Sequence, residues 1–187
     1  MNRTTKINIG GKEYILCYSS RVVRSICVKF GSPGKMNEML ENEAPITRVE
    51  TMLFVIHELI QAGAVFAKMN GFNNPEPLTL KELNTLFPVM HPRMIVGKIR
   101  EAITLGSAVS VEIKQKQQKG KAKNGPKLKL TPDRILWWGL HIGLDYNTTL
   151  DIPHGELLSL INEEQIEQGM ADVKITNSEE DPFPDWE

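Results

Sequence analysis

The chain has 187 residues, of which 41% are hydrophobic and 24% are charged, and its formal net charge at pH 7 is −1. These values are those of an ordinary globular protein that can bury a core. A charge this close to zero excludes a global field that would draw the protein to nucleic acid or to a membrane. The charge is segregated instead: seven lysines and no acidic residue fall between Lys114 and Lys129, and six acidic residues stand beside Lys174 in 171–187.

The cysteines and the N-terminus bear on the compartment. Cys17 and Cys27 show neither a paired framework nor a metal-ligand spacing, so we expect reduced thiols in a reducing compartment. The first residues lack the apolar stretch of a signal peptide, and no apolar run reaches the ~18 residues needed to span a bilayer. We therefore expect a cytosolic protein with no membrane partner.

The segment up to Gly31 predicts a β-hairpin followed by a helix. Ile7 and Ile9 alternate with polar residues, and Gly10-Gly11 can supply the positive φ angles of a two-residue hairpin turn. From Ser19 or Ser20 onward, apolar residues recur on one helical face until Gly31, a typical helix stop. A two-stranded hairpin is marginal alone, so we expect this helix to cover its apolar face.

Four helices are predicted in the middle of the chain, over about 36–43, 47–70, 79–87 and 91–106. Two of them open with a capping box, Thr47-Arg-Val-Glu50 and Thr79-Leu-Lys-Glu82, in which a side-chain oxygen and a carboxylate satisfy free backbone donors. The longest carries an apolar residue every three or four positions, ends by Gly71, and should face the core.

A strand is predicted where the chain enters the lysine-rich stretch. Val109, Val111 and Ile113 alternate with polar residues, and so does Lys127-Leu128-Lys129-Leu130. These two segments are candidates for a second β-ribbon with a basic tip. The alternative is that 114–130 is a solvated connector.

The C-terminal part predicts two helices and a tail. The helix that starts at Thr131-Pro132-Asp133 is apolar almost all round, as far as Leu144, and needs cover on more than one side. A second helix is expected from about Asp151 to Gly169, after a loop. Residues 171–187 are acidic, contain two prolines and have no periodicity, which is typical of a disordered tail.

These elements predict an α+β fold that is mostly helical, with the N-terminal β-hairpin packed on helices. The parts expected are a hairpin plus helical body over 1–113, a lysine-rich connector or ribbon over 114–130, a C-terminal helical segment over 131–170 and the tail over 171–187.

No catalytic or metal-binding pattern emerges from the residue spacings. His57-Glu58 begins like the zinc-protease helix motif, but Gln61 stands where the second histidine must be. The glycines at Gly120 and Gly125 lack the preceding strand and the hydroxyl residue of a phosphate loop. We therefore expect no enzyme, no metal and no cofactor.

The lysine-rich stretch suggests a DNA-binding regulator as an alternative function. The helices before it, followed by a basic ribbon, resemble a winged helix-turn-helix over 79–130. The second of these helices offers only Arg93, Lys98 and Arg100 against Glu101, and the lysine stretch has no aromatic residue on which bases could stack. Nucleic acid is therefore the less favoured partner.

Trp137 and Trp138 are the main candidates for partner binding. Neighbouring residues of a helix point about 100° apart, so a two-helix segment can hardly bury both rings. Either both pack on the first module, or one or both anchor a partner, since aromatic residues dominate interface hot spots.

Three stretches stand out by their order and spacing. They are Ile7-Asn-Ile-Gly-Gly-Lys-Glu-Tyr14 with Lys29-Phe30-Gly31; Leu59-Ile-Gln-Ala-Gly-Ala64 with Leu78-Thr-Leu-Lys-Glu-Leu83; and Trp137-Trp138-Gly139-Leu140 with Leu150-Asp-Ile-Pro-His-Gly-Glu-Leu-Leu158 and Glu164-Gln-Ile-Glu-Gln-Gly169. Together they resemble the tail assembly chaperones of siphophages and prophages of Gram-positive bacteria, over roughly residues 5–170. The length of the lysine stretch and the acidic tail depart from this pattern.

The resemblance implies a non-catalytic protein of the host cytoplasm that is absent from the mature virion. Such chaperones coat the tape-measure protein, keep its apolar surface soluble and help recruit tail-tube subunits. The partners implied are the tape-measure protein and the tail-tube protein, and self-association stays open. We expect the tape-measure contact on exposed apolar helix surface, at Trp137, Trp138 and Leu140. The segment 131–170 resembles a part that some members add by ribosomal frameshifting.

Overall fold

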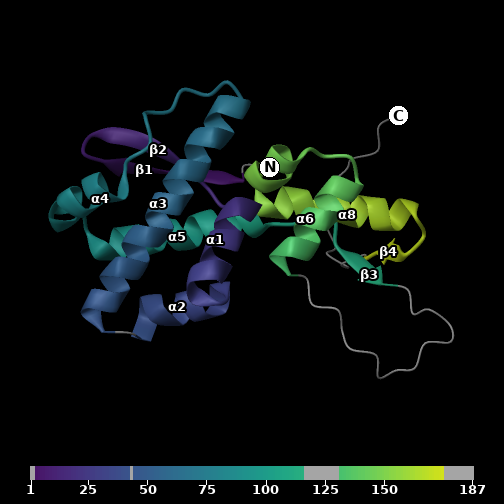
Figure 1. The fold of residues 1–187 in the computed structure, drawn as a ribbon, viewed down its shortest axis with the longest axis horizontal. Helices are drawn as coiled ribbons and strands as arrows, with labels where there is room; N and C mark the ends of the chain where they lie inside the picture. Colours follow the sequence, from purple (N-terminus) through teal and green to yellow (C-terminus); the bar gives the residue numbers. More distant parts are fainter. Residues whose placement is uncertain (1–2, 43, 116–130, 175–187) are drawn as a thin grey trace, which may run out of the picture.

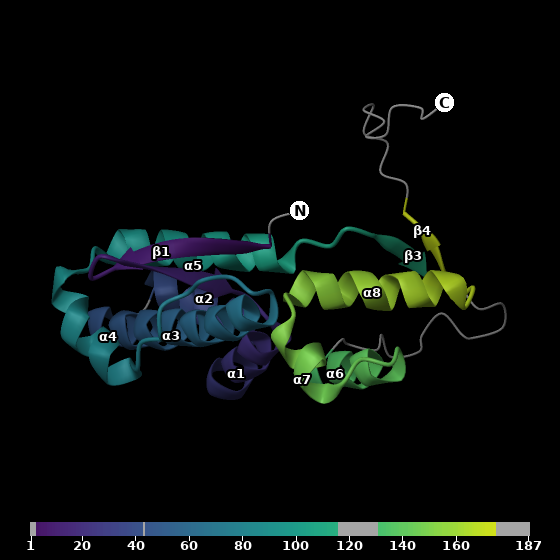
Figure 2. The ribbon, with the colours of Figure 1, turned by 90° about the horizontal axis from the view of Figure 1, so that it is seen from above.

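The computed structural model describes residues 3–42, 44–115 and 131–174. Within these residues the chain forms eight α-helices, one short 3-10 helix and two pairs of antiparallel strands. The predicted α+β, mostly helical fold is confirmed. The molecule is elongated: an N-terminal body (4–42 and 44–107) lies end to end with a smaller C-terminal module (113–115 and 131–173), as Figure 1 and Figure 2 show.

The N-terminal hairpin consists of β1 (Thr4–Ile9) and β2 (Lys12–Cys17), paired from Thr4 opposite Cys17 to Ile9 opposite Lys12. Gly10 and Gly11 between them have φ of 59° and 78°, a conformation that suits the strand twist and that glycine adopts without strain. The predicted two-residue turn is confirmed.

The hairpin packs on helices, as predicted, and α3 (Pro45–Met69) is the central one. The expectation that the helix directly after the hairpin covers it is wrong, since α3 and the helix over Pro92–Ser107 pack on the strands instead. Gly63 brings α3 against the backbone of β2, because a Cβ atom there would lie 1.8 Å from the carbonyl oxygen of Ile15. The other helices of the N-terminal body are α1 (Ser20–Phe30), α2 (Pro33–Asn42), α4 (Leu80–Leu86), the 3-10 helix η1 (Phe87–Val89) and α5 (Pro92–Ser107). The largest fully buried side chains, all in this body, are Tyr14, Ile7, Leu16, Ile26, Met36, Met52, Ile56, Leu59, Ile60, Leu83, Ile95 and Ile99.

The two predicted capping boxes have different outcomes. At α4 the box is present: the Thr79 hydroxyl accepts from the Glu82 N–H at 3.3 Å, and the Glu82 carboxylate accepts from the Thr79 N–H at 2.7 Å. At α3 the box is absent, because the helix begins earlier, with Ala44 as N-cap and Pro45 in its first turn. Proline suits that position, since its φ is already helical and its missing N–H is not needed there.

α3 also corrects the expectation that no segment is apolar enough to span a bilayer. Among the described residues, α3 passes the test of length and composition for a membrane span. The expectation considered only uninterrupted runs of apolar residues, and the apolar sequence of α3 is interrupted by His57, Glu58 and Gln61. Half of the apolar window of α3 is buried within the protein, where α3 forms the centre of the core.

The C-terminal module contains α6 (Pro132–His141), α7 (Tyr146–Asp151) and α8 (His154–Glu167). Its small core consists of Ile135, Leu157 and Ile161, with half-buried apolar side chains around them. The start of α6 matches the prediction. Its expected end at Leu144 is wrong, since the helix ends at His141 and Gly143 has a φ of 89°, which is not helical.

α7 occupies a segment for which a loop was predicted. Asp145 caps it, since its side chain accepts from the N–H groups of Asn147 and Thr148. The following helix, α8, therefore begins at His154 and not near Asp151.

The second strand pair joins distant parts of the chain. β3 (Ile113–Gln115) pairs with β4 (Ala171–Val173), and the Lys174 N–H donates to the Glu112 carbonyl at 2.8 Å. The predicted partner of this strand, 127–130, lies outside the described residues. The prediction that the tail lacks regular structure is wrong for Ala171–Val173, and 175–187 also lie outside the described residues.

The N-terminal body and the C-terminal module meet in a polar junction. Arg21 of α1 donates to both carboxylate oxygens of the buried Asp151, at 2.6 and 3.0 Å. The His154 N–H donates to the Tyr18 carbonyl at 2.9 Å, and its Nδ1 lies 3.1 Å from the Ser20 hydroxyl. Gly155 packs so closely that a Cβ atom would lie 2.1 Å from the Ala108 carbonyl oxygen. These contacts come from both sides of the junction and hold the two parts in one orientation.

Candidate protein-binding surface

The two neighbouring tryptophans of α6 have different environments. Trp138 is half-buried and packs on the core of Ile135, Leu157 and Ile161. Trp137 is 55% exposed, and Leu140 is 44% exposed. The structure therefore separates the three candidate residues into one that stabilises the module and two that face outward.

The Trp137 ring is held in place by its neighbours. It stacks on the His141 ring, one turn later, with centroids 5.0 Å apart and an angle of 11° between the planes. It also meets Trp138 edge to face, with centroids 5.3 Å apart. A large exposed ring that is already ordered loses little conformational freedom when it binds, which is the property of an interface anchor.

Side chains from α1 and α7 extend the surface around Trp137. Arg24 lies 3.7 Å from the carboxylate of Asp133, which is one turn before Trp137 on α6. The same guanidinium donates to the hydroxyl of Tyr146 at 3.3 Å. We call these six residues the Trp137 surface: Arg24, Asp133, Trp137, Leu140, His141 and Tyr146.

α6 is fixed behind this surface by close packing on α7. Gly139 lies against Thr149, so that a Cβ atom there would be 2.2 Å from the threonine methyl group. Ile135 is buried in the module core. The exposed face of α6 is therefore presented by a supported helix.

Sequence reasoning found part of the Trp137 surface. Asp133, Trp137 and His141 recur at intervals of four, so their common helical face could have been read from the sequence. Arg24 and Tyr146 could not, because they join the surface only through the packing of α1 on α6 and α7.

The side chains considered for catalysis form no reactive arrangement. His57 lies 3.2 Å from the Glu58 carboxylate and 3.4 Å from the Gln61 amide, all on α3. The hydrogen bond with His57 is the main cause that lowers the pKa of Glu58. Within residues 3–42, 44–115 and 131–174 no group of three or more His, Cys, Asp or Glu side chains could hold a metal ion.

The two cysteines are free thiols, as expected. Cys17 is fully buried, and burial raises its pKa to about 12. Burial also raises the pKa of the half-buried Cys27. A thiolate is the reactive form, so neither site favours nucleophilic chemistry at neutral pH.

The cations of the helix-turn-helix-like region are partly neutralised. In α5, Lys98 pairs with Glu101 at 2.7 Å and Arg100 pairs with Glu41 of α2 at 2.5 Å. The buried face of α5 packs in the main core through Ile95 and Ile99. Two of the three cations considered on α5 are therefore less available to phosphates, whereas Arg93 has no ion-pair partner among the described residues.

Comparisons with family models, with curated proteins and with solved structures found no match to this chain.

Proposed function

We propose that this protein is a phage tail assembly chaperone that binds the tape-measure protein through the Trp137 surface and helps recruit tail-tube subunits. It would act in the host cytoplasm and be absent from the mature virion. The observation that carries the proposal is the stacked ring of Trp137 beside Leu140, with 55% and 44% of the two side chains exposed. The resemblance of the sequence stretches named above supports the choice of partner.

The physical logic follows from the chemistry of a tape-measure helix. Such a helix exposes apolar stripes that aggregate before the tail tube encloses them. A chaperone with one aromatic anchor and a polar rim binds such a stripe weakly and reversibly. Many copies along the helix turn weak contacts into a stable coat, which tube subunits can still displace.

The alternative of a DNA-binding regulator over 79–130 receives less support. The α5 cations Lys98 and Arg100 are already paired with carboxylates, and β3 pairs with β4. A winged helix-turn-helix needs a free basic helix for the major groove.

The test is co-purification with a tape-measure protein co-expressed from the same phage. Trp137→Ala and Leu140→Ala should each reduce the amount of captured tape-measure protein by about tenfold, since anchor residues carry most of an interface's binding energy. Circular dichroism should be unchanged, because both side chains are exposed. Ile46→Ala is the matched control, since Ile46 is also exposed and apolar but lies at the start of α3.

Wild-type capture that survives both substitutions would remove the Trp137 surface from the interface. Absence of wild-type capture, with DNA retained at physiological salt, would favour the regulator instead.

A further inference from the structure

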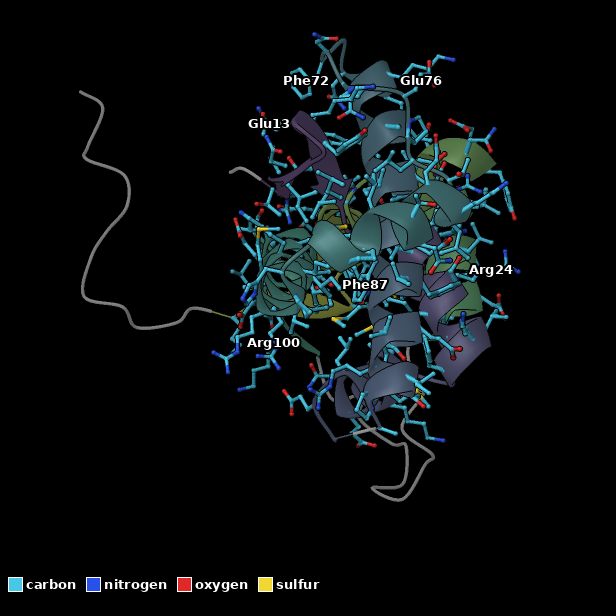
Figure 3. All side chains as sticks on the ribbon, turned by 90° about the vertical axis from the view of Figure 1, so that its left-hand side faces the viewer. Glu13, Arg24, Phe72, Glu76, Phe87 and Arg100 are labelled. Carbon is cyan, nitrogen blue, oxygen red and sulfur yellow. The ribbon has the colours of Figure 1, made fainter. Side chains whose placement is uncertain are left out.

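A groove lies between the end of α3 and the start of α8, lined on these sides by Phe66 and Glu156. It has a volume of about 540 Å³ and contains no residue of the Trp137 surface. A second cavity of about 860 Å³ adjoins it over the hairpin and shares Thr4 and Phe72 with it. Figure 3 shows that Phe72 and Arg24, which belongs to the Trp137 surface, lie on different sides of the molecule.

The two walls of the groove offer apolar surface. On the first wall, Phe72 is 55% exposed and rests on Phe66, with ring centroids 6.0 Å apart. On the second wall, Leu160 of α8 is 42% exposed. An apolar side chain inserted between Phe72 and Leu160 would remove both from water.

Two carboxylates flank Leu160 on the wall that α8 forms. Glu156 and Glu163 stand four residues before and three residues after it, so the three side chains follow one strip of the helix. Among the residues that the structure describes, neither carboxylate has an ion-pair partner. The strip is therefore acidic, apolar and acidic in turn.

The other charged groups near the groove are already engaged. Arg3 donates to the Ala108 carbonyl and to the Ser110 hydroxyl, the latter at 2.6 Å. In the adjoining cavity, Lys6 pairs with Glu13 at 2.6 Å, and Lys98 pairs with Glu101. Arg3 keeps its positive charge, because its partners are neutral, so the three charged side chains that line the groove carry a net charge of about −1. The two negative charges lie on the α8 wall, which therefore attracts cations and repels phosphate groups.

We propose that this groove binds a basic amphipathic helix of another protein. Its apolar side chain fits between Phe72 and Leu160, and two of its lysine or arginine residues pair with Glu156 and Glu163. The carboxylates are seven positions apart on α8, which is about 10 Å along the axis. Cations seven positions apart on a helix aligned with α8 have the same spacing. This inference is independent of the tail-chaperone proposal, since it uses other residues.

The experiment measures fluorescence anisotropy of a labelled helical peptide of leucine and lysine, about 18 residues long, with the full chain at physiological salt. A second peptide carries glutamate in place of lysine. We expect binding of the lysine peptide alone. Phe72→Ala and the double variant E156Q/E163Q should each weaken it by about tenfold. The matched control is the double variant E164Q/E167Q, which removes the same two charges from α8 outside the groove.

Three results would overturn the proposal. The first is equal binding of the two peptides. The second is a loss with E164Q/E167Q as large as with E156Q/E163Q, which indicates non-specific attraction. The third is a wild-type dimer in sedimentation velocity that Phe72→Ala dissociates, which assigns the groove to a second copy. The carboxylate variants remove no apolar contact, so they test the groove even if Phe72→Ala lowers stability.

Discussion

At the scale of single residues, Trp137 and Trp138 show how one helical step changes the role of a side chain. Trp138 packs on Leu157 and Ile161, so its ring helps to hold α6 on α8. Trp137 turns outward and stacks on His141. The same residue type therefore contributes to stability at one position and to surface chemistry at the next.

This division predicts different effects on stability. Trp138→Ala should lower the free energy of unfolding by about 2 kcal/mol, below the value for a fully buried ring because Trp138 is half-buried. Trp137→Ala should change it by less than about 0.5 kcal/mol, as an exposed residue does. Urea unfolding followed by circular dichroism measures both. Equal losses at the two positions would contradict the division.

At the scale of elements, the two threonine-led capping patterns separate local signals from tertiary context. Thr79 and Glu82 form the box because α4 starts where the pattern predicts. Thr47 and Glu50 have the same sequence pattern, but α3 already begins at Pro45, so both residues lie inside the helix. A capping pattern thus predicts a helix start only where no stronger helix-start signal, such as a proline, precedes it.

A pair of alanine substitutions tests this difference. Thr79→Ala should cost about 1 kcal/mol of unfolding free energy, the usual contribution of an N-cap side chain. Thr47→Ala should cost less than about half of that, since its side chain caps no helix. Thermal unfolding of the two variants measures the contrast, and a larger loss for Thr47→Ala would show that the helix starts at Thr47.

The elements that the sequence predicted well are those with local causes. Gly10-Gly11 fixes the hairpin turn, and Gly31 and Gly71, both at positive φ, end their helices. The elements that it missed depend on distant partners. β4 has only three residues and exists through pairing with Ile113–Gln115, and α7 follows an Asp145 cap that could equally have closed a loop.

The candidate surfaces divide in the same way. The sequence showed that a two-helix segment can hardly bury both Trp137 and Trp138, but not which ring is exposed, and it gave no sign of the groove. Phe72 is far from Leu160 and Glu163 in the chain, and only the packing that places the end of α3 beside α8 brings it near them.

At the scale of the whole molecule, stability depends on the junction, where His154 is half-buried beside Ser20 and meets the Tyr18 ring edge to face. Burial lowers the pKa of His154 to about 4. An unfolded chain has a histidine pKa of about 6.5. The unfolded state therefore takes up a proton first as the pH falls, which favours unfolding.

The predicted result is a loss of stability between about pH 6.5 and pH 4, of about 3 kcal/mol if His154 alone is responsible. His154→Gln keeps a polar side chain and removes the titration. The difference in unfolding free energy between wild type and His154→Gln should therefore change across this window and be constant above it. Parallel curves for the two proteins would exclude His154 as the cause.

The junction has one more consequence. Its contacts are of three kinds: a bidentate pair from Arg21, a backbone hydrogen bond to Tyr18 and the close packing of Gly155 on Ala108. Because these contacts constrain the junction in different directions, we expect the two parts to move together as one rigid unit and not to bend at a hinge. Whatever reorients the hairpin end of the protein therefore swings Trp137 through the same angle, with no internal rearrangement to absorb the motion.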